Sequence, residues 1–235
     1  NISFMVDTSV SLSSSDVENI KTSLKETFET IQAKAQETGS GIIKVQLIDF
    51  DTYVQYSVSV DMADPKALDT LGRVINAMQS DGGTNYVDAF NTAGNWFNGE
   101  AAHRVNGNKV AEQGVKATEG AINLSYFITD GVPTIYSRAV ERGSEKNAGE
   151  DRYMSSGADG MGGSQPTYVD LGGNSWSPDN KSLEMSQAAY KKLLENVSGL
   201  TVHAFGFGDE LNSSQLDYFD SEGNSVTGLN PEDIA

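Results

Sequence analysis

The stretch that decides the fold lies at the start of the chain and reads Ile2-Ser3-Phe4-Met5-Val6-Asp7-Thr8-Ser9-Val10-Ser11. Its first half is a short apolar run, which is typical of a buried central strand. Its second half changes to one carboxylate and two alternating hydroxyls. Residues two apart in an extended segment point the same way, so we expect Asp7, Ser9 and Ser11 to converge just beyond the strand.

Segments with strand and helix patterns alternate along the rest of the chain. Further short apolar runs predict strands over residues 42–48, 53–60, 122–129 and 200–205. Apolar residues at steps of three and four predict helices over residues 17–35, 65–78, 86–97, 183–197 and 211–219. This alternation predicts an α/β fold, Rossmann-like and doubly wound, with a mostly parallel sheet and helices on both faces. The tight connection before 53–60 makes that segment an antiparallel edge strand.

The 235 residues fit one domain, spanning 1–235. The pattern lapses over residues 132–180, where glycine is frequent, and we expect a long loop insertion there. Trp176 in that insertion is a candidate contact residue. A polar tail at 221–235 has room for one short strand. Because the chain opens directly in a strand, we interpret it as a domain cut from a longer protein.

Composition excludes several classes of function. The chain has 16 Lys and Arg against 33 Asp and Glu, a net charge of −17, and it has no basic cluster. Nucleic-acid binding is therefore not expected, because it needs a basic surface. No cysteine is present, which excludes disulfides and thiolate chemistry. No apolar run of 18 residues occurs, so we expect no membrane insertion.

Polar residues gather where ligands bind in α/β sheets, beyond the carboxyl ends of the strands. Asp7, Ser9 and Ser11 follow the first strand, Thr84 lies in a glycine-rich loop, and Asp130 follows strand 122–129. Each group alone is more typical of a turn or helix cap. Together they form an all-oxygen set, which suits Mg²⁺, Mn²⁺ or Ca²⁺. Few charged ligands would leave the ion electron-poor, with an open position for an external carboxylate.

These motifs resemble those of von Willebrand factor type A domains with a metal-ion-dependent adhesion site. The matching stretches are Phe4-Met5-Val6-Asp7-Thr8-Ser9-Val10-Ser11, Gly82-Gly83-Thr84-Asn85 and Phe127-Ile128-Thr129-Asp130-Gly131-Val132-Pro133-Thr134. The resemblance implies that Ser9, Ser11 and Thr84 bind one divalent cation directly, while Asp7 and Asp130 bind it directly or through water. It also implies a mostly parallel sheet with one antiparallel edge strand, and a protein partner or other ligand that supplies an acidic group to the ion.

The acidic, cysteine-free composition further resembles the type A domain of a large bacterial repeats-in-toxin adhesin. That resemblance implies an extracellular or cell-surface location and a monomeric domain within a long multidomain chain. It also suggests extra Ca²⁺ in the 132–180 insertion.

Two other function classes remain open. One is a metal-dependent phosphotransferase or hydrolase with Asp7 as nucleophile. Against it, the acid–base Asp that phosphatases commonly carry two residues later is replaced by Ser9. The other is a structural spacer domain of a large adhesin. Neither His103 nor His203 has a triad partner at a recognisable spacing, and no Gly-x-Ser-x-Gly motif occurs. We therefore expect a binding domain and not an enzyme.

Overall fold

The fold is built on a six-stranded sheet in a computed structural model that describes residues 1–37, 39, 41–100, 114–141, 167–173, 180–207, 211 and 213–229. The strand order is β3-β2-β1-β4-β7-β8. The bounds are Ile2–Asp7 for β1, Lys44–Phe50 for β2, Val54–Asp61 for β3, Asn123–Thr129 for β4, Leu200–Phe207 for β7 and Val226–Leu229 for β8. Every pair is parallel except β2–β3. The predicted parallel sheet with an antiparallel edge strand is confirmed.

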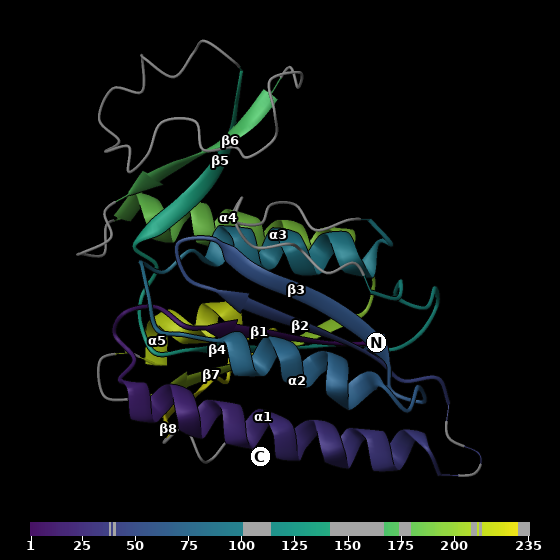
Figure 1. The fold of residues 1–235 in the computed structure, drawn as a ribbon. Coiled ribbons are helices and arrows are strands. Elements are labelled where there is room, and N and C mark those ends of the chain that lie inside the picture. The colour runs from purple at the N-terminus through teal and green to yellow at the C-terminus, as the bar shows by residue number, and fades with distance from the viewer. Residues whose placement is uncertain are drawn as a thin grey trace.

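Helices cover both faces of this sheet, as predicted (Figure 1). On one face lie α1 (Ser14–Ala35) and α2 (Ala67–Ala77), and on the other lie α3 (Tyr86–Phe97) and α4 (Asn180–Asn196). The short α5 (Ser213–Leu216) and the 3₁₀ helix η2 (Asp217–Phe219) join the α3–α4 side of the core. Among the described residues, no helix combines the length and apolar character that crossing a bilayer requires.

The central position of β1 follows from its apolar run. Phe4 and Val6 belong to the core on the α1–α2 side, and Met5 belongs to the core on the α3–α4 side. All three are buried, Met5 and Val6 completely. A strand that is apolar on both faces is stable only where helices cover both faces, which is the environment of a central parallel strand.

A row of polar side chains crosses the sheet near the amino ends of β1 and β4. Ser3 donates to Gln46 Oε1 at 2.8 Å, and Gln46 Nε2 donates to Ser57 Oγ at 3.2 Å. On the other side, Ser125 Oγ donates to the Ser3 carbonyl at 3.2 Å. All four residues are buried, so the row satisfies polar groups inside the core.

The expected long loop over 132–180 is wrong in part. Within it, β5 (Ile135–Glu141) and β6 (Thr167–Gly173) form a two-stranded antiparallel sheet. The strands lie far apart in sequence, so their pairing leaves no local turn signal of the kind that a short hairpin has. The short strand expected in the polar tail is present as β8, parallel to β7.

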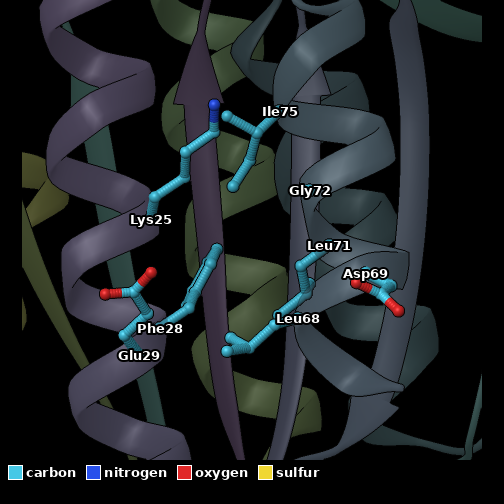
Figure 2. Close-up of a pocket in the computed structure, with 8 residues that line it drawn as sticks. All are labelled: Lys25, Phe28, Glu29, Leu68, Asp69, Leu71, Gly72 and Ile75. Atoms are coloured by element: carbon cyan, nitrogen blue, oxygen red, sulfur yellow. The ribbon is translucent and has the colours of Figure 1, made fainter.

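A shallow groove of about 190 Å³ lies between α1 and α2 (Figure 2). Phe28 of α1 and Leu71 of α2 point toward each other across it, and Lys25 and Glu29 lie on the α1 side. Small-molecule pockets usually enclose about 300–1,000 Å³, so this groove is small for a ligand site. None of the predicted metal ligands lines it.

Candidate metal centre

Three loops meet beyond the carboxyl ends of the central parallel strands. The first follows β1 and begins at Asp7, the second precedes α3 and contains Thr84, and the third follows β4 and begins at Asp130. β1 and β4 are neighbouring parallel strands with Val6 paired to Ile128, so Asp7 ends level with Thr129. The first and third loops therefore leave the sheet side by side.

The first and third loops bring their polar side chains into contact. Ser9 Oγ lies 3.2 Å from Ser11 Oγ and donates to Asp130 Oδ1 at 3.4 Å. The Ser9 backbone N–H donates to Asp7 Oδ1 at 2.9 Å. Asp7 and Ser9 are each 1% exposed, whereas Ser11 faces solvent. The cluster is thus buried at its base and open at Ser11.

Thr84 reaches the same cluster from the second loop. A Cβ placed on Gly131 would lie 3.8 Å from Ser11 Oγ and 4.0 Å from Thr84 Oγ1. Both hydroxyls therefore flank the residue that follows Asp130. The structure thus brings together all of the predicted ligands: Asp7, Ser9, Ser11, Thr84 and Asp130.

The second loop is fixed to the first by backbone hydrogen bonds. The Val10 N–H donates to the Gly82 carbonyl at 3.2 Å, and the Asp81 N–H donates to the Thr8 carbonyl at 3.0 Å. Ser80 Oγ adds a bond to the Ser9 carbonyl at 3.1 Å. These contacts hold the serine loop and the Thr84 loop at one relative position.

The start of β5 holds the backbone of Thr84. The Thr84 N–H donates to Thr134 Oγ1 at 3.0 Å. In return, the Thr84 carbonyl accepts from the N–H groups of Thr134 at 3.0 Å and Ile135 at 3.1 Å. The Ile135 side chain is completely buried and lies against Gly83. The β5–β6 hairpin is therefore anchored directly to the loop that carries a candidate ligand.

Burial raises the pKa of Asp7 well above its usual range, and the nearby Asp130 raises it further. Hydrogen bonds from Thr129 and Ser9 act in the opposite direction but do not cancel these effects. Two carboxyl groups beside three hydroxyls are thus held in a buried place where negative charge is unfavourable. Hard divalent cations prefer oxygen ligands and would offset that charge, so this donor set fits such an ion.

Sequence reasoning missed Thr129 and Tyr86. Thr129 Oγ1 donates to Asp7 Oδ2 at 2.6 Å and lies 3.1 Å from the Tyr86 hydroxyl. A signal for Thr129 did exist, because strand alternation from Phe127 places it on the α3 side of β4. Nothing in the sequence marks Tyr86, whose position at the start of a helix is equally suited to a simple core residue.

Trp176 lies outside the described residues, and so do residues 142–166 and 174–179 of the 132–180 insertion, for which extra Ca²⁺ is predicted. Within the described part of the chain, no group of three or more His, Asp or Glu residues is placed to hold a metal.

Comparison with known proteins connects this geometry to a fold. No protein-family model matches the sequence, and neither does any curated protein. Solved structures do match. One is proximal thread matrix protein 1 from the mussel byssus, whose metal-ion-dependent adhesion site is occupied by zinc. The two sequences are 13% identical, and the match, with a TM-score of 0.54, covers 100% of this chain and 44% of that one. This chain thus spans less than half of the mussel protein.

Two bacterial surface structures also match. The von Willebrand factor domain of the type V pili tip protein Mfa5 from Porphyromonas gingivalis has 12% identity and a TM-score of 0.60, over 98% of this chain and 89% of that one. The pilus adhesin SpaC from Lactobacillus rhamnosus GG has 15% identity and a TM-score of 0.59, over 99% of this chain and 28% of that one. Identities this low establish the fold alone. The chain has the fold of von Willebrand factor type A domains.

Proposed function

We propose that this chain is a divalent-cation-dependent binding domain of an adhesion-type surface protein. One ion, Mg²⁺ or Ca²⁺ with Mn²⁺ as a further candidate, would be held by Asp7, Ser9, Ser11, Thr84 and Asp130. An acidic group of a protein or other surface ligand would complete its coordination. The observation that carries the proposal is the convergence of two loops: Ser9 Oγ lies 3.2 Å from Ser11 Oγ of its own loop and 3.4 Å from Asp130 Oδ1 of the loop after β4.

The composition of the donor set supports an ion with an open position. Three of the five side chains are neutral hydroxyls, so the ion would keep much of its positive charge. It would then attract a further carboxylate from outside. The exposed side of the cluster is suited to this, since Ser11 faces solvent and the neighbouring Val10 is 54% exposed.

The geometry argues against the enzymatic alternative. Asp7 is 1% exposed, and both of its oxygens already accept hydrogen bonds, Oδ1 from the Ser9 N–H and Oδ2 from Thr129. A nucleophilic carboxylate must reach its substrate, which this buried and doubly bonded group does not do. We therefore propose a binding function without catalysis.

The neighbours in fold support an extracellular setting. They include a pilus tip domain and a pilus adhesin, and this chain matches 28% of the length of the adhesin. We propose a cell-surface location for this chain too, as a monomeric domain of a multidomain adhesin. Its cysteine-free acidic composition favours the bacterial repeats-in-toxin type.

The test begins with the ion. Calorimetric titration of the 235-residue chain with Mn²⁺ and Mg²⁺ is expected to show one site, and Thr84→Ala is expected to weaken binding strongly with the circular dichroism spectrum unchanged. Thr70→Ala is a matched control, because Thr70 is half-buried on α2, outside the three loops of the centre. Absence of divalent-ion binding by the unchanged chain would refute the proposal.

A second measurement tests the open position. With Mn²⁺ bound, the relaxation rate of solvent protons reports water that is coordinated to the ion. Acetate is expected to replace that water and lower the rate. If acetate at tens of millimolar leaves the rate unchanged, the ion has no position for an acidic group. The adhesive mechanism would then be wrong even though an ion binds. Turnover of a generic phosphate ester, abolished by Asp7→Asn, would instead favour the enzymatic alternative.

A further inference from the structure

A chain of buried hydroxyls connects the candidate metal centre to the aromatic core. Thr129 Oγ1 lies 2.6 Å from Asp7 Oδ2 and 3.1 Å from the Tyr86 hydroxyl. The Tyr86 hydroxyl also contacts the Gly131 carbonyl, directly after Asp130. Tyr86 therefore lies beneath both the first and the third loop of the centre.

The direction of these bonds follows from the number of protons. A hydroxyl has one proton to donate, and the short contact with a carboxylate assigns the Thr129 proton to Asp7. The Gly131 carbonyl can only accept, so the Tyr86 proton is donated to it. The Thr129 oxygen accepts from the Gly131 N–H at 3.4 Å. Each hydroxyl thus fixes a different part of the centre.

The position of the Tyr86 ring is fixed by its neighbours. The ring is 1% exposed and lies edge-on to Phe127 at 4.6 Å and to Phe219 at 5.3 Å between centroids. Phe50 and Phe90 lie farther out, at 6.3 and 6.1 Å. These rings come from β4, η2, β2 and α3, so the core of the domain determines where the hydroxyl sits.

Tyr86 is also close in sequence to a candidate ligand. It begins α3 two residues after Thr84, so the rigid ring and the Thr84 loop belong to one continuous segment. The Tyr86 hydroxyl lies against Thr129 Oγ1, the atom that donates to Asp7, and it donates to the carbonyl of Gly131, directly after Asp130. Tyr86 and Thr129 therefore lie next to each other behind the centre, where Tyr86 holds the third loop and Thr129 holds Asp7.

We propose that Tyr86 and Thr129 are positioning residues that hold Asp7 and the Asp130–Gly131 peptide in place for a divalent cation without touching it. The inference rests on the proposed function, since it concerns the same ion. Groups behind the ligands of a metal commonly change its affinity by about 10- to 100-fold when removed. Both Asp7 oxygens are held, Oδ2 by Thr129 and Oδ1 by the Ser9 N–H, so losing either bond frees the carboxylate to turn.

The chain offers a matched control for Tyr86. Tyr190 is also buried in the aromatic core, 5.3 Å from Phe90 and 5.6 Å from Phe219. Among the described residues its hydroxyl has no hydrogen-bond partner. Tyr86→Phe and Tyr190→Phe therefore remove the same atom from the same cluster, and only the first removes a contact with the metal loops.

The experiment measures Mn²⁺ and Mg²⁺ affinity by calorimetry and the melting temperature of the metal-free chain. Tyr86→Phe is expected to weaken ion binding about 10-fold and Tyr190→Phe to leave it unchanged. Thr129→Val is expected to weaken binding, while Thr129→Ser, which keeps the hydroxyl, is expected to retain it. A purely structural role would lower the melting temperature of the metal-free variant without changing the affinity at a temperature where it is folded.

The outcomes separate this inference from the proposed function. If the unchanged chain binds the ion, Thr84→Ala weakens binding strongly, and Tyr86→Phe binds as tightly as the unchanged chain, the positioning role is refuted while the metal centre stands. Equal affinities for Thr129→Val and Thr129→Ser would refute it independently. If the unchanged chain does not bind a divalent ion, the proposed function fails, and this inference fails with it.

Discussion

Gly83→Ala tests whether the β5–β6 hairpin and the Thr84 loop are packed as closely as the structure shows. An added Cβ would lie 2.5 Å from Ile135 Cδ1, 2.9 Å from Thr134 Oγ1 and 3.1 Å from Ile135 Cγ1. These distances are too short for carbon and oxygen atoms, so the side chains must move. The closest atom is the end of an isoleucine side chain, but the residue is completely buried and has little free space.

The magnitude follows from the cost of overpacking. Forcing an extra carbon into a well-packed region costs about 1–3 kcal/mol, and we expect Gly83→Ala to lower the free energy of unfolding by about 2 kcal/mol. For a chain of this size that corresponds to a fall of roughly 4–8 °C in melting temperature. Gly72→Ala is the matched control, since nothing lies within 4 Å of the added Cβ there. It lies inside α2 and is expected to stabilise by about 0.5–1 kcal/mol.

The assay is urea unfolding followed by circular dichroism, with chelator present so that ion binding does not contribute. A double variant sharpens it. Ile135→Val removes the atom nearest to the new Cβ and alone costs about 0.5–1.5 kcal/mol. Combined with Gly83→Ala it is expected to cost about 1 kcal/mol less than the sum of the two single changes. Strict additivity, or a Gly83→Ala variant as stable as the unchanged chain, would refute the close packing of hairpin and loop.

Three further predictions concern other parts of the fold. Ser13 caps α1 by accepting from the Asp16 N–H at 3.2 Å, so Ser13→Ala should lower the free energy of unfolding by about 1 kcal/mol; no loss in urea unfolding would contradict the capping. Phe127 is completely buried among aromatic rings, so Phe127→Ala should cost about 3–5 kcal/mol; a loss below 1 kcal/mol, by the same assay, would show a looser core. Mg²⁺ at 100 times its dissociation constant should stabilise the chain by about 2.7 kcal/mol, and addition of chelator should reverse the rise in melting temperature; an unchanged melting temperature would count against ion binding to the folded state.

Much of the architecture could be predicted because its signals are local. The apolar run Ile2–Val6 is too short for a helix and lacks a polar face, which leaves a central strand. The alternation of Asp7, Ser9 and Ser11 directly after it predicts three side chains on one side of a loop. The carboxyl-end rule then places Asp130 nearby, because strand 122–129 is a further strand of the same parallel sheet.

The rest depends on contacts between distant segments. Strand β5 (residues 135–141) pairs with β6 (residues 167–173). The sequences of these two strands contain polar residues and glycine, and such a pattern does not show which strand pairs with which. The contact of Tyr86 with Thr129 requires knowing that the first turn of α3 lies beneath the end of β4. A tyrosine that begins a helix looks the same in sequence whether its hydroxyl is buried or not. Distances of this kind come only from the folded chain.

The polar row formed by Ser3, Gln46, Ser57 and Ser125 has a consequence for the opposite end of the sheet. Because β1 is apolar on both faces, a slip of two residues against β2 and β4 would leave apolar side chains facing both helical layers. The hydrophobic pattern alone therefore penalises such a slip only weakly. The slip would, however, break the side-chain bond of Ser3 to Gln46, and each buried polar group left unpaired costs about 1–3 kcal/mol.

Strands rise about 3.3 Å per residue, so a two-residue slip would carry Asp7 roughly 7 Å away from Thr129. The side-chain bond between Ser3 and Gln46 at one end of the sheet thus helps to fix the position of the Asp7 carboxylate along the strand direction at the other end. Replacing these two residues with apolar residues of similar size would keep the core filled and remove the alignment of the loops that follow.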